Sequence, residues 1–431
     1  MQPKHQRNYE FRCPLHGFVT LTDWEREIIS QPAYQRLRRI RQLAWTDQVY
    51  PGAMHTRFEH SLGVMHVATA MFDGIINSSR TILEKELRFD EAGLQRDRIL
   101  VRLTALLHDV GHSPFSHAAE ELFPQVEGEN RPFKHEEYSA AIIRERLREA
   151  IEQHPLNDNY HISAGEIANL LEGSTETGRS LVWRDIITGQ IDADRIDYLL
   201  RDSLHAGVHY GRFDWRRLIG CLALVRTESE RGFRLGVTEG GLHAAESLVL
   251  ARYFMFTQVY FHKTRVAYDH HLQHALAEIL PGAHFPKPSG TDLDEFLKWD
   301  DWRVLGFLAD GQGGDHGRRL CNRDHFREVY HTPEIPNPTD LSRFDKICED
   351  LGDQLQCVVP AEKSWYKVDE TDIPIESDNP GNQIVPLSKL SSVIAGLKPI
   401  RKRMAYCRPE DKEAAQEIVS RRIAKKEGGK R

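Results

Sequence analysis

Two histidines and two carboxylates, separated along the chain, are the residues best suited to chemistry in this sequence. His60 ends the segment A-M-H-T-R-F-E-H, and His108 and Asp109 are adjacent in L-L-H-D-V-G-H-S-P-F-S-H. A further carboxylate, Asp194, lies downstream in I-D-A-D-R-I-D-Y. Imidazole nitrogen with carboxylate oxygen suits Mn, Fe, Ni, Zn or Mg, and few protein ligands leave open positions for water and substrate. The pattern therefore predicts one divalent metal ion held for hydrolytic chemistry.

A metal ion in such a setting lowers the pKa of bound water and polarises a phosphoryl oxygen. The order of a separated histidine, an adjacent His-Asp pair and a later aspartate is typical of metal-dependent phosphohydrolases. An isolated His-Asp pair would more often satisfy itself at a helix end. Here four more histidines accompany the pair in a polar cluster beside an apolar helix, which favours a metal site over that interpretation. These histidines are His55, His60, His112 and His117.

Helical periodicity dominates the elements that must hold these residues. The apolar run over residues 99–107 predicts a buried helix that ends at the His-Asp pair, and Gly111 provides a stop. Two apolar segments, residues 222–225 and 233–237, flank a polar turn and predict a hairpin. Helices are predicted over residues 22–29, 34–44, 60–76, 98–109, 136–151, 163–171, 191–202 and 242–260.

The stretch P-G-A-H-F-P-K-P-S-G breaks this pattern and divides a core, residues 1–280, from a C-terminal helical and irregular region, residues 281–431. In the second region D-G-Q-G-G-D-H-G lacks the Gly-Lys-Ser/Thr of a phosphate-binding loop and indicates a flexible loop. A terminal helix over residues 411–426 has an acidic start and a basic end. Its basic residues are interpreted as solvated rather than bound to nucleic acid.

Composition indicates a soluble protein without general nucleic-acid binding. A length of 431 residues predicts roughly two or three domains, and the net charge is −7. No stretch has the length and apolarity of a transmembrane span, and the polar start is unlike a signal peptide. The 6 cysteines have no metal-type spacing and fit free thiols in a reducing cytoplasm.

Seven ordered motifs resemble those of the HD-domain superfamily, and more narrowly the deoxynucleoside triphosphate triphosphohydrolases of the SAM-and-HD-domain type. The resemblance runs from Pro14 to Lys263. It implies a mainly α fold: an HD-domain helical core with a small β-hairpin and an α(+β) C-terminal region. It also implies that His60, His108, Asp109 and Asp194 hold the metal. The motifs are P-L-H-G, Y-Q-R-L-R-R-I-R-Q-L, H-T-R-F-E-H-S-L-G-V, H-D-V-G-H-S-P-F-S-H, K-H-E-E, I-D-A-D-R-I-D-Y-L-L-R-D and Q-V-Y-F-H-K.

The same resemblance implies a catalytic group of His112, His117, His135 and Glu120, which assists water attack or protonates the leaving group. Glu120 stands where the family usually has Asp, and a longer carboxylate can still orient an imidazole. Without the resemblance, His135 would be taken as an ordinary surface histidine.

Arginine and lysine at matched positions are expected near the phosphates, because guanidinium and ammonium groups complement phosphate oxygens. Arg195 stands where the family commonly has Lys. Gln42, Asp202 and Tyr260 match a sugar pocket in which the tyrosine fills the space of a 2′-hydroxyl. The implied substrate-binding residues are Gln42, Leu43, Arg57, Arg195, Tyr198, Asp202, Arg252, Tyr260 and Lys263, with His117 also placed near the phosphates.

Neighbouring charged residues have plainer interpretations. Asp194, Tyr198 and Asp202 share one helical face, whereas Asp192 and Asp197 fall on other faces and are interpreted as a helix cap or a structural ion pair. The arginines among residues 36–41 interleave with Leu37 and Ile40, which indicates an amphipathic helix with a solvated basic face.

Regulation is expected to differ from that of vertebrate members of the family, which have a guanine-nucleotide activator site and assemble as tetramers. Gln35 and Arg38 match that site, but Ser30 replaces the Asp that reads guanine and Tyr9 replaces a phosphate-contacting Lys. A different nucleotide effector, or none, stays open. Phe256 replaces a pocket histidine, which bears on the base accepted. A homo-oligomer, dimer or tetramer, is expected.

The leading hypothesis is hydrolysis of deoxynucleoside triphosphates at the α-phosphate to deoxynucleoside and triphosphate, without a membrane partner. A metal-dependent nuclease or phosphodiesterase, acting on single-stranded nucleic acid or cyclic nucleotides, is the alternative. The retained Gln42, Asp202 and Tyr260 speak against it, because endonucleolysis needs no mononucleotide sugar pocket. An inactive nucleotide-sensing scaffold ranks last because all four metal-ligand positions are intact.

Overall fold

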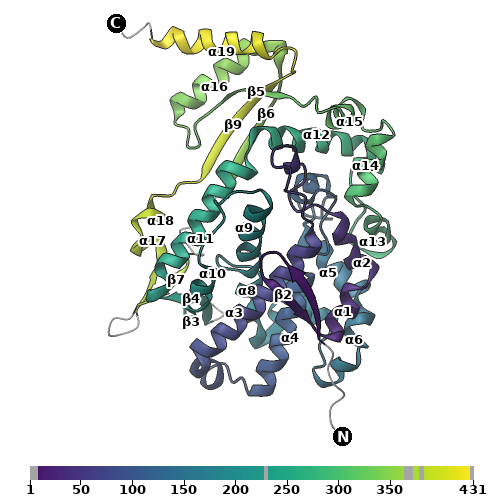
Figure 1. Ribbon diagram of the computed structural model, residues 1–431, viewed down its shortest axis with the longest axis vertical. Helices are drawn as coiled ribbons and strands as arrows, with labels where there is room; N and C mark the ends of the chain where they lie inside the picture. The colour runs from purple at the N-terminus through teal and green to yellow at the C-terminus, as the bar shows by residue number, and fades with distance from the viewer. Residues whose placement is uncertain (1–7, 228–231, 364–371, 378–382, 428–431) are drawn as a thin grey trace.

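Helices form most of the structure, and short strands make three small sheets in the described part of the chain. The computed structural model describes residues 8–227, 232–363, 372–377 and 383–427. Figure 1 shows helices packed around the centre, with a narrow sheet and two helices at one end. The predicted fold class, mainly α with a small hairpin and a mixed C-terminal region, is confirmed.

Three packed helices form the centre of the fold. α3 (Arg57–Lys85) lies against both α4 (Glu91–Leu107) and α9 (Ala193–His205). Thr56 and Glu59 form a capping box at the start of α3, which satisfies backbone N–H groups that would otherwise lack partners. The long buried face of α3 therefore starts at a defined residue, three positions before the first predicted metal ligand.

Each of these helices presents a predicted metal ligand at one of its ends. His60 lies in the first turn of α3, His108 is the C-cap of α4, and Asp194 lies in the first turn of α9. α3 and α9 approach closely at Gly63, where an added Cβ would lie 2.0 Å from Asp197 Oδ1. Glycine at this position thus brings the ligands of α3 and α9 together.

The chain begins with a hairpin that the sequence did not predict. β1 (Tyr9–Cys13) and β2 (Gly17–Leu21) pair antiparallel, and the left-handed turn falls at Gly17, with φ +79°. α1 (Asp23–Ile29) follows from a capping box of Thr22 and Glu25.

The helix predicted over residues 34–44 is wrong beyond residue 39. α2 (Pro32–Gln35) continues only as a 3-10 turn, η1 (Arg36–Arg39). Arg36 is buried and donates to backbone carbonyls of two distant segments, so the predicted solvated basic face is wrong at this residue. The backbone N–H of Arg41 donates to Asp301 Oδ2 at 2.9 Å, a residue far away in sequence. Tertiary hydrogen bonds thus replace the helical ones.

Most other predicted helices are confirmed, and two are divided. In the first divided helix, Leu147 lies between the two halves and has φ −107° and ψ −3°, which departs from regular α-helical backbone angles. The second divided helix ends in a π-helical turn, and such turns are frequent at functional sites. The divided helices are α5 (His135–Glu145) with α6 (Arg148–Glu152), and α11 (Leu242–Met255) with η7 (Phe256–Tyr260).

The predicted hairpin is confirmed as β3 (Leu222–Arg226) paired antiparallel with β4 (Phe233–Thr238). Its turn, residues 228–231, lies outside the described residues. A late segment joins this sheet, because β7 (Pro374–Glu376) pairs parallel with β4 and antiparallel with β8 (Ile384–Pro386).

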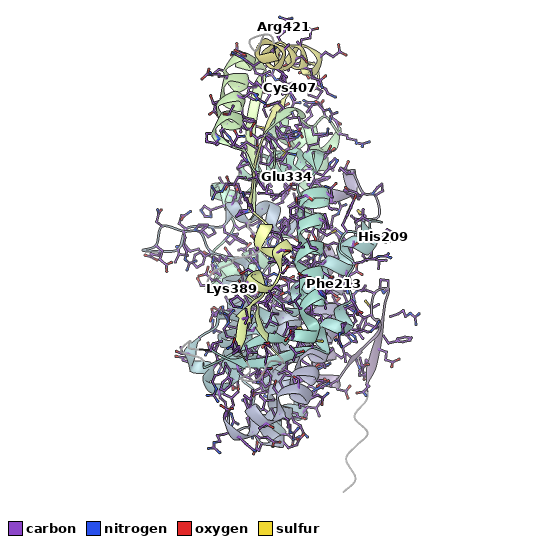
Figure 2. All side chains as sticks on the ribbon, turned by 90° about the vertical axis from the view of Figure 1, so that its left-hand side faces the viewer. His209, Phe213, Glu334, Lys389, Cys407 and Arg421 are labelled. Atoms are coloured by element: carbon purple, nitrogen blue, oxygen red, sulfur yellow. The ribbon has the colours of Figure 1, made fainter. Side chains whose placement is uncertain are left out.

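The third sheet lies near the C-terminus, in the order β5-β9-β6. Helices α16 and α19 lie beside it in Figure 1, and α19 confirms the predicted terminal helix. In Figure 2, Cys407 and Arg421 mark this end of the molecule, while Lys389 marks the segment that returns to the body. The elements are β5 (Arg327–His331), α16 (Pro338–Leu351), β6 (Leu355–Lys363), β9 (Ile400–Cys407) and α19 (Lys412–Glu427).

The main hydrophobic core includes side chains on both sides of position 280, among them Leu276, Phe285 and Phe296. Two smaller clusters lie within and beside the C-terminal sheet, around Tyr406 and Ile347. The division at residues 280 and 281 stays a prediction.

Among the residues that the structure describes, no helix is both long enough and apolar enough to cross a membrane.

The remaining helices connect the parts described above. These helices are α7 (Ala164–Glu172), α8 (Arg184–Ile187), α10 (Trp215–Ile219), α12 (Lys263–Ile279), α13 (Gly290–Leu297), α14 (Asp301–Ala309), α15 (Gly314–Cys321), α17 (Leu387–Leu390) and α18 (Ser392–Gly396).

Candidate active site

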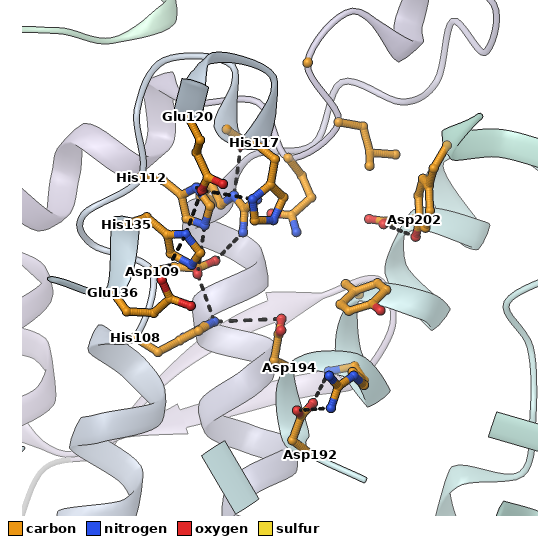
Figure 3. A pocket seen from close by; sticks show the side chains of 18 of the residues that line it. His108, Asp109, His112, His117, Glu120, His135, Glu136, Asp192, Asp194 and Asp202 are labelled. Carbon is orange, nitrogen blue, oxygen red and sulfur yellow. Dashed lines mark hydrogen bonds and ion pairs between the residues drawn. The ribbon is translucent and has the colours of Figure 1, made fainter. Parts of the chain in front are cut away.

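The four predicted metal ligands converge on one point. His60 Nε2 lies 3.0 Å from Asp194 Oδ1 and 3.5 Å from Asp109 Oδ2. His108 Nε2 lies 3.2 Å from Asp109 Oδ1 and 3.9 Å from Asp194 Oδ1. Figure 3 shows His108, Asp109 and Asp194 facing one another at one end of a pocket. Donor atoms this close together can share one cation.

The hydrogen bonds of the two imidazoles direct their lone pairs toward this point. His60 Nδ1 donates to Asp197 Oδ2 at 2.8 Å, and His108 Nδ1 donates to the Ala105 carbonyl at 2.8 Å. Both Nε2 atoms are left to face the carboxylates. His108 Nε2 is buried and has no hydrogen-bond partner among the described residues. Metal-ligating histidines typically have this arrangement, so the residues fit a divalent ion.

The electrostatics of the cluster also favour a cation. Burial disfavours the charged form of His60, yet without a metal the hydrogen bonds to Asp194 and Asp197 raise the pKa of His60 to about 9, and a cation bound at Nε2 would take the place of that proton. Burial acts against ionisation of Asp109 as well, but the nearby Arg57 and histidines hold the pKa of that carboxyl well below its usual range. The ligands therefore keep negative charge around a point where a cation is stabilised.

Asp197 has a role that sequence reasoning missed. Its buried carboxylate accepts from Arg201 Nε at 2.7 Å, which matches the predicted structural ion pair, and it also fixes the ring of His60. Asp192 is the N-cap of α9 and pairs with Arg195 at 2.6 Å. The i,i+4 spacing of Asp197 and Arg201 was the available sequence signal for the ion pair.

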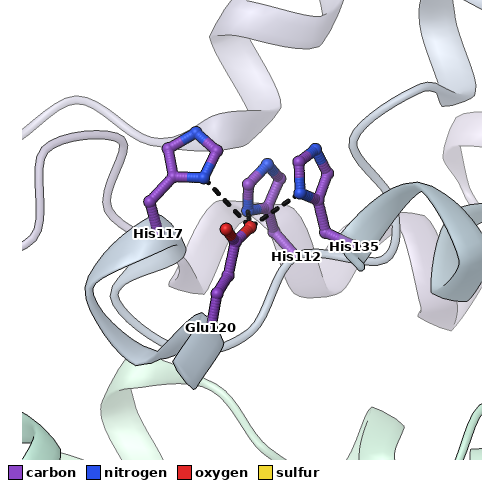
Figure 4. Close-up of side chains that lie close together, drawn as sticks. All are labelled: His112, His117, Glu120 and His135. Atoms are coloured by element: carbon purple, nitrogen blue, oxygen red, sulfur yellow. Dashed lines mark ion pairs between the residues drawn. The ribbon is translucent and has the colours of Figure 1, made fainter. Parts of the chain in front are cut away.

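The predicted catalytic group also assembles, around a single carboxylate. Glu120 Oε1 lies 2.6 Å from His135 Nδ1, 3.0 Å from His117 Nδ1 and 3.8 Å from His112 Nδ1. His112 and His135 stack with ring centroids 4.0 Å apart. Figure 4 shows the three imidazoles gathered around the Glu120 carboxylate. Glutamate thus reaches all three rings from the turn η3 (Ser116–Leu122).

His112 and His135 differ in protonation. Burial opposes a charge on His135, but the Glu120 carboxylate raises the pKa of His135 to about 9. Burial, Arg57 and His135 hold the pKa of His112 well below its usual range. At neutral pH His135 is therefore an imidazolium and lies beside a neutral His112.

The loop that carries these residues is strained and is held by distant side chains. Phe115 and Ser116 have φ of 57° and 58°, and such backbone costs about 1–3 kcal/mol per residue. The Phe115 N–H donates to Asp301 at 2.7 Å, and Arg36 Nη2 donates to the His112 carbonyl at 2.7 Å. Burial raises the pKa of Asp301 to about 7. Sequence reasoning missed Asp301, which lies beyond the predicted core boundary and has no motif.

A cavity of about 540 Å³ opens from the metal ligands. Of the nine predicted substrate-binding residues, Lys263 alone is not in its lining and is exposed at the start of α12. Arg265 lines the cavity instead, two residues later on the same helix, and sequence reasoning missed it. The predicted residues that line it are Gln42, Leu43, Arg57, Arg195, Tyr198, Asp202, Arg252 and Tyr260.

The far end of the cavity is polar and partly preorganised. Asp202 accepts from Tyr260 Oη at 2.6 Å and from His55 Nε2 at 2.8 Å. Gln42 Oε1 is buried without a hydrogen-bond partner among the described residues. His55 was noted in the sequence only as a neighbour of the metal ligands, and its contact with Asp202 comes from folding. Figure 3 shows Asp202 across the pocket from His108.

The fold and the site define a metal-dependent phosphohydrolase. Comparison with known proteins agrees: the HD domain matches residues 57–202 and the HD-associated region matches residues 213–424. The chain belongs to the HD-domain family, and the resemblance seen in its motifs is confirmed.

Relatives include an uncharacterized protein of Methanocaldococcus jannaschii, 34% identical over 91% of this chain and 77% of that protein. A protein called deoxynucleoside triphosphate triphosphohydrolase SAMHD1 homolog, from Dictyostelium discoideum, is 29% identical over 78% of this chain and 63% of its own length. The crystal structure of a hypothetical protein from Aquifex aeolicus aligns with a TM-score of 0.77 and 31% identity, covering 96% of this chain and 100% of that one.

Proposed function

We propose that the protein hydrolyses deoxynucleoside triphosphates at the α-phosphate, releasing a deoxynucleoside and intact triphosphate. One observation carries the proposal: a single cavity joins the metal-ligand cluster to the pocket of Gln42, Asp202 and Tyr260, with arginines along its lining. A nucleotide placed with its sugar at Asp202 has its phosphates directed toward Asp109 and Asp194. The name of the Dictyostelium relative supports the same substrate class.

In the proposed reaction, water adds its oxygen to the α-phosphorus, the bond from phosphorus to the 5′-oxygen breaks, and the 5′-oxygen takes a proton. A divalent ion bound by His60, His108, Asp109 and Asp194 supplies Lewis-acid polarisation of a phosphoryl oxygen and acidifies water. Arg195 and Arg252 line the cavity, where guanidinium groups stabilise charge that develops on phosphate oxygens.

His135 is assigned as the proton donor. Its Nδ1 is bound to Glu120, its pKa is raised to about 9, and it lines the cavity. General acids of this kind contribute about 10²–10⁴-fold to rate. His112 is a neutral imidazole at neutral pH, because its pKa is lowered by burial and by Arg57, so it lacks the acidic proton of an imidazolium.

The sugar end supports selection of deoxyribose. Tyr260 Oη is committed to Asp202 at 2.6 Å, so its ring is held where it narrows the pocket beside the carboxylate. The second Asp202 oxygen is bound to His55. Gln42, with its unpaired Oε1, is then available to accept a hydrogen bond from a sugar hydroxyl, which selects for a sugar that carries a hydroxyl at that position. Exclusion of ribose would come from the Tyr260 ring, which fills the space of a 2′-hydroxyl.

Product analysis tests this proposal directly. The purified chain is incubated with each deoxynucleoside triphosphate and with Mn²⁺ or Mg²⁺, and the products are separated by chromatography. Deoxynucleoside with triphosphate is the expected pair. Monophosphate with pyrophosphate would contradict it, and shortening of a labelled oligonucleotide in place of nucleotide hydrolysis would move the function to nucleic-acid cleavage.

Two variants complete the experiment. Asp109→Asn should abolish product formation because it removes a metal ligand. His243→Gln alters an exposed histidine on α11 whose contact is with Glu246, so it should leave the rate unchanged. Equal activity of wild type and Asp109→Asn would contradict the proposal that Asp109 holds the catalytic metal.

A further inference from the structure

A second group of histidines lies outside the cavity. His270 and His274 are one turn apart on α12, and His316 lies on α15. One nitrogen from each ring lies within 4.8 Å of the other two. None of the three is in the lining of the cavity.

Glycines bring α15 onto α12. Gly313 and Gly314 have φ of +81° and +56°, values that favour glycine. A Cβ on Gly314 would lie 2.3 Å from Glu278 Oε2, and one on Gly313 would lie 3.0 Å from Ala275 Cβ. The glycine-rich segment, predicted to be a flexible loop, is therefore a site of close helix approach whose last residues begin α15 and place His316 over α12.

Hydrogen bonds within the group fix which ring nitrogens can bind a metal. His274 Nδ1 lies 2.9 Å from the His270 carbonyl and donates to it, which leaves the Nε2 lone pair of His274 for a ligand.

A fourth, fully buried histidine positions His316. His271 Nε2 accepts the Phe326 N–H at 3.0 Å, so its proton is on Nδ1 and is donated to His316 Nδ1 at 2.8 Å. His316 thus offers one lone pair, at Nδ1, which a metal would take in exchange for this hydrogen bond. The rings of His274 and His316 now stack 4.5 Å apart, so binding would also turn one of them.

We propose that His270, His274 and His316 form a second metal site, which takes Zn²⁺ and bridges α12 to α15. Three imidazoles without thiolate suit a borderline divalent ion and leave a fourth position for water or for a carboxylate. Mg²⁺, which prefers oxygen ligands, is not expected there. This site does not depend on the proposed reaction.

The bridge has a structural consequence for the active site. α12 packs against η3, the turn that carries His117 and Glu120, and it begins three residues after Tyr260. A metal that fixes α15 to α12 stabilises the helix that supports both of these parts of the cavity.

Metal stoichiometry tests the proposal. The full chain is freed of metal with a chelator, dialysed against Zn²⁺, and analysed for zinc per chain by mass spectrometry. His274→Gln and His316→Gln should each bind one ion fewer than wild type, or bind it about tenfold or more weakly. His243→Gln, an exposed histidine on another helix, should match wild type. Wild-type zinc content and affinity in both His274→Gln and His316→Gln would overturn the proposal.

A second set of variants, built on Asp109→Asn, distinguishes the ion between α12 and α15 from the metal of the active site. Asp109→Asn should retain the α12–α15 ion, and Zn²⁺ should raise its melting temperature, whereas the Asp109→Asn, His274→Gln double variant should show no shift. His274 is exposed, so equal melting of wild type and His274→Gln without metal checks that the fold is kept. An Asp109→Asn protein that Zn²⁺ does not stabilise would also overturn the second site.

Discussion

The two histidine groups of this protein place the same side chain in different surroundings. In the active site, carboxylates lie beside the rings, and the Glu120 carboxylate raises the pKa of His135 to about 9 against the effect of burial. Between α12 and α15 the neighbours are mainly other imidazoles, and the pKa values of His270 and His271 are lowered to about 4 and about 2. Burial acts in the same direction in both groups, so the partners decide the difference.

His112 shows that position alone does not set the outcome. It lies inside the active site, 3.2 Å from Asp109, yet its pKa is lowered because burial, Arg57 and His135 outweigh that carboxylate. The active site therefore contains both an imidazolium, at His135, and a neutral imidazole, at His112, a pair that general acid–base chemistry can use. In the α12–α15 group the lowered pKa values keep His270 and His271 neutral.

The largest effect is expected from removing an active-site carboxylate. Asp109→Asn deletes a metal ligand and leaves the buried Arg57 without its ion pair, so kcat/KM should fall by about 10⁴-fold or more. Steady-state kinetics and metal content measure this. Asp73→Asn, which alters a half-exposed pair with Arg98, is the matched control. Activity within tenfold of wild type would remove Asp109 from the chemistry.

The next effect concerns the imidazolium of the active site. Because the pKa of His135 is raised to about 9, its proton is present at neutral pH, and kcat should decline as the pH rises through about 9. His135→Gln should lower kcat by about 10²–10⁴-fold and abolish this alkaline decline. A His135→Gln enzyme with an unchanged pH profile would assign the proton donor elsewhere, with His117 the first candidate.

A smaller effect is expected when His60 loses the carboxylate that orients it. Asp197→Asn should weaken metal binding by about 10–100-fold, because the amide no longer holds the Nδ1 proton of His60 as a carboxylate does. Metal titration followed by calorimetry gives the affinity. Unfolding by urea is measured in parallel, since Asp197 also pairs with the buried Arg201. Unchanged metal affinity would show that Asp197 contributes through its ion pair with Arg201 and not by orienting His60.

The smallest effect is expected in the histidine group between α12 and α15, where the free energy of unfolding should depend on pH through His271. The folded-state pKa of His271 is about 2, below its ordinary value of 6.5, so the unfolded chain binds a proton that the folded chain does not. Stability is complete above pH 6.5 and should fall as the pH drops, by about 1.4 kcal/mol per pH unit from this residue. His271→Asn should reduce that slope, as measured by urea unfolding from pH 7 to pH 5. An unchanged slope would show that His271 protonates without unfolding.

The sequence predicted much of the site because the chemistry lies in compact motifs. His108, Asp109 and His112 occur within five residues, and Asp194 follows in a motif of its own. Residue types that can ligate a metal or move a proton are few, so their spacing was informative. The helices that carry them were also predicted, since their apolar periodicity is strong. The hairpin of β3 and β4 followed from two apolar segments that flank a polar turn.

Other parts of the site had no local signal. Arg36 looked like one of several surface arginines, yet it is buried and donates to the His112 carbonyl. Asp301 lies 186 residues beyond Phe115, whose N–H it accepts. The pairing of β7 with β4 likewise joins segments distant in sequence. Such contacts depend on which surfaces meet after folding, and a one-dimensional pattern does not contain that information.

By itself the sequence determined which side chains could ligate a metal, which helices would carry them and which family the motifs resemble. The tertiary structure decided the charge on each histidine, the partner that fixes each ring and the meeting of α12 with α15. The physical reason is that a pKa and a hydrogen bond depend on distance and burial in three dimensions. Residue identity fixes only what a side chain is able to do.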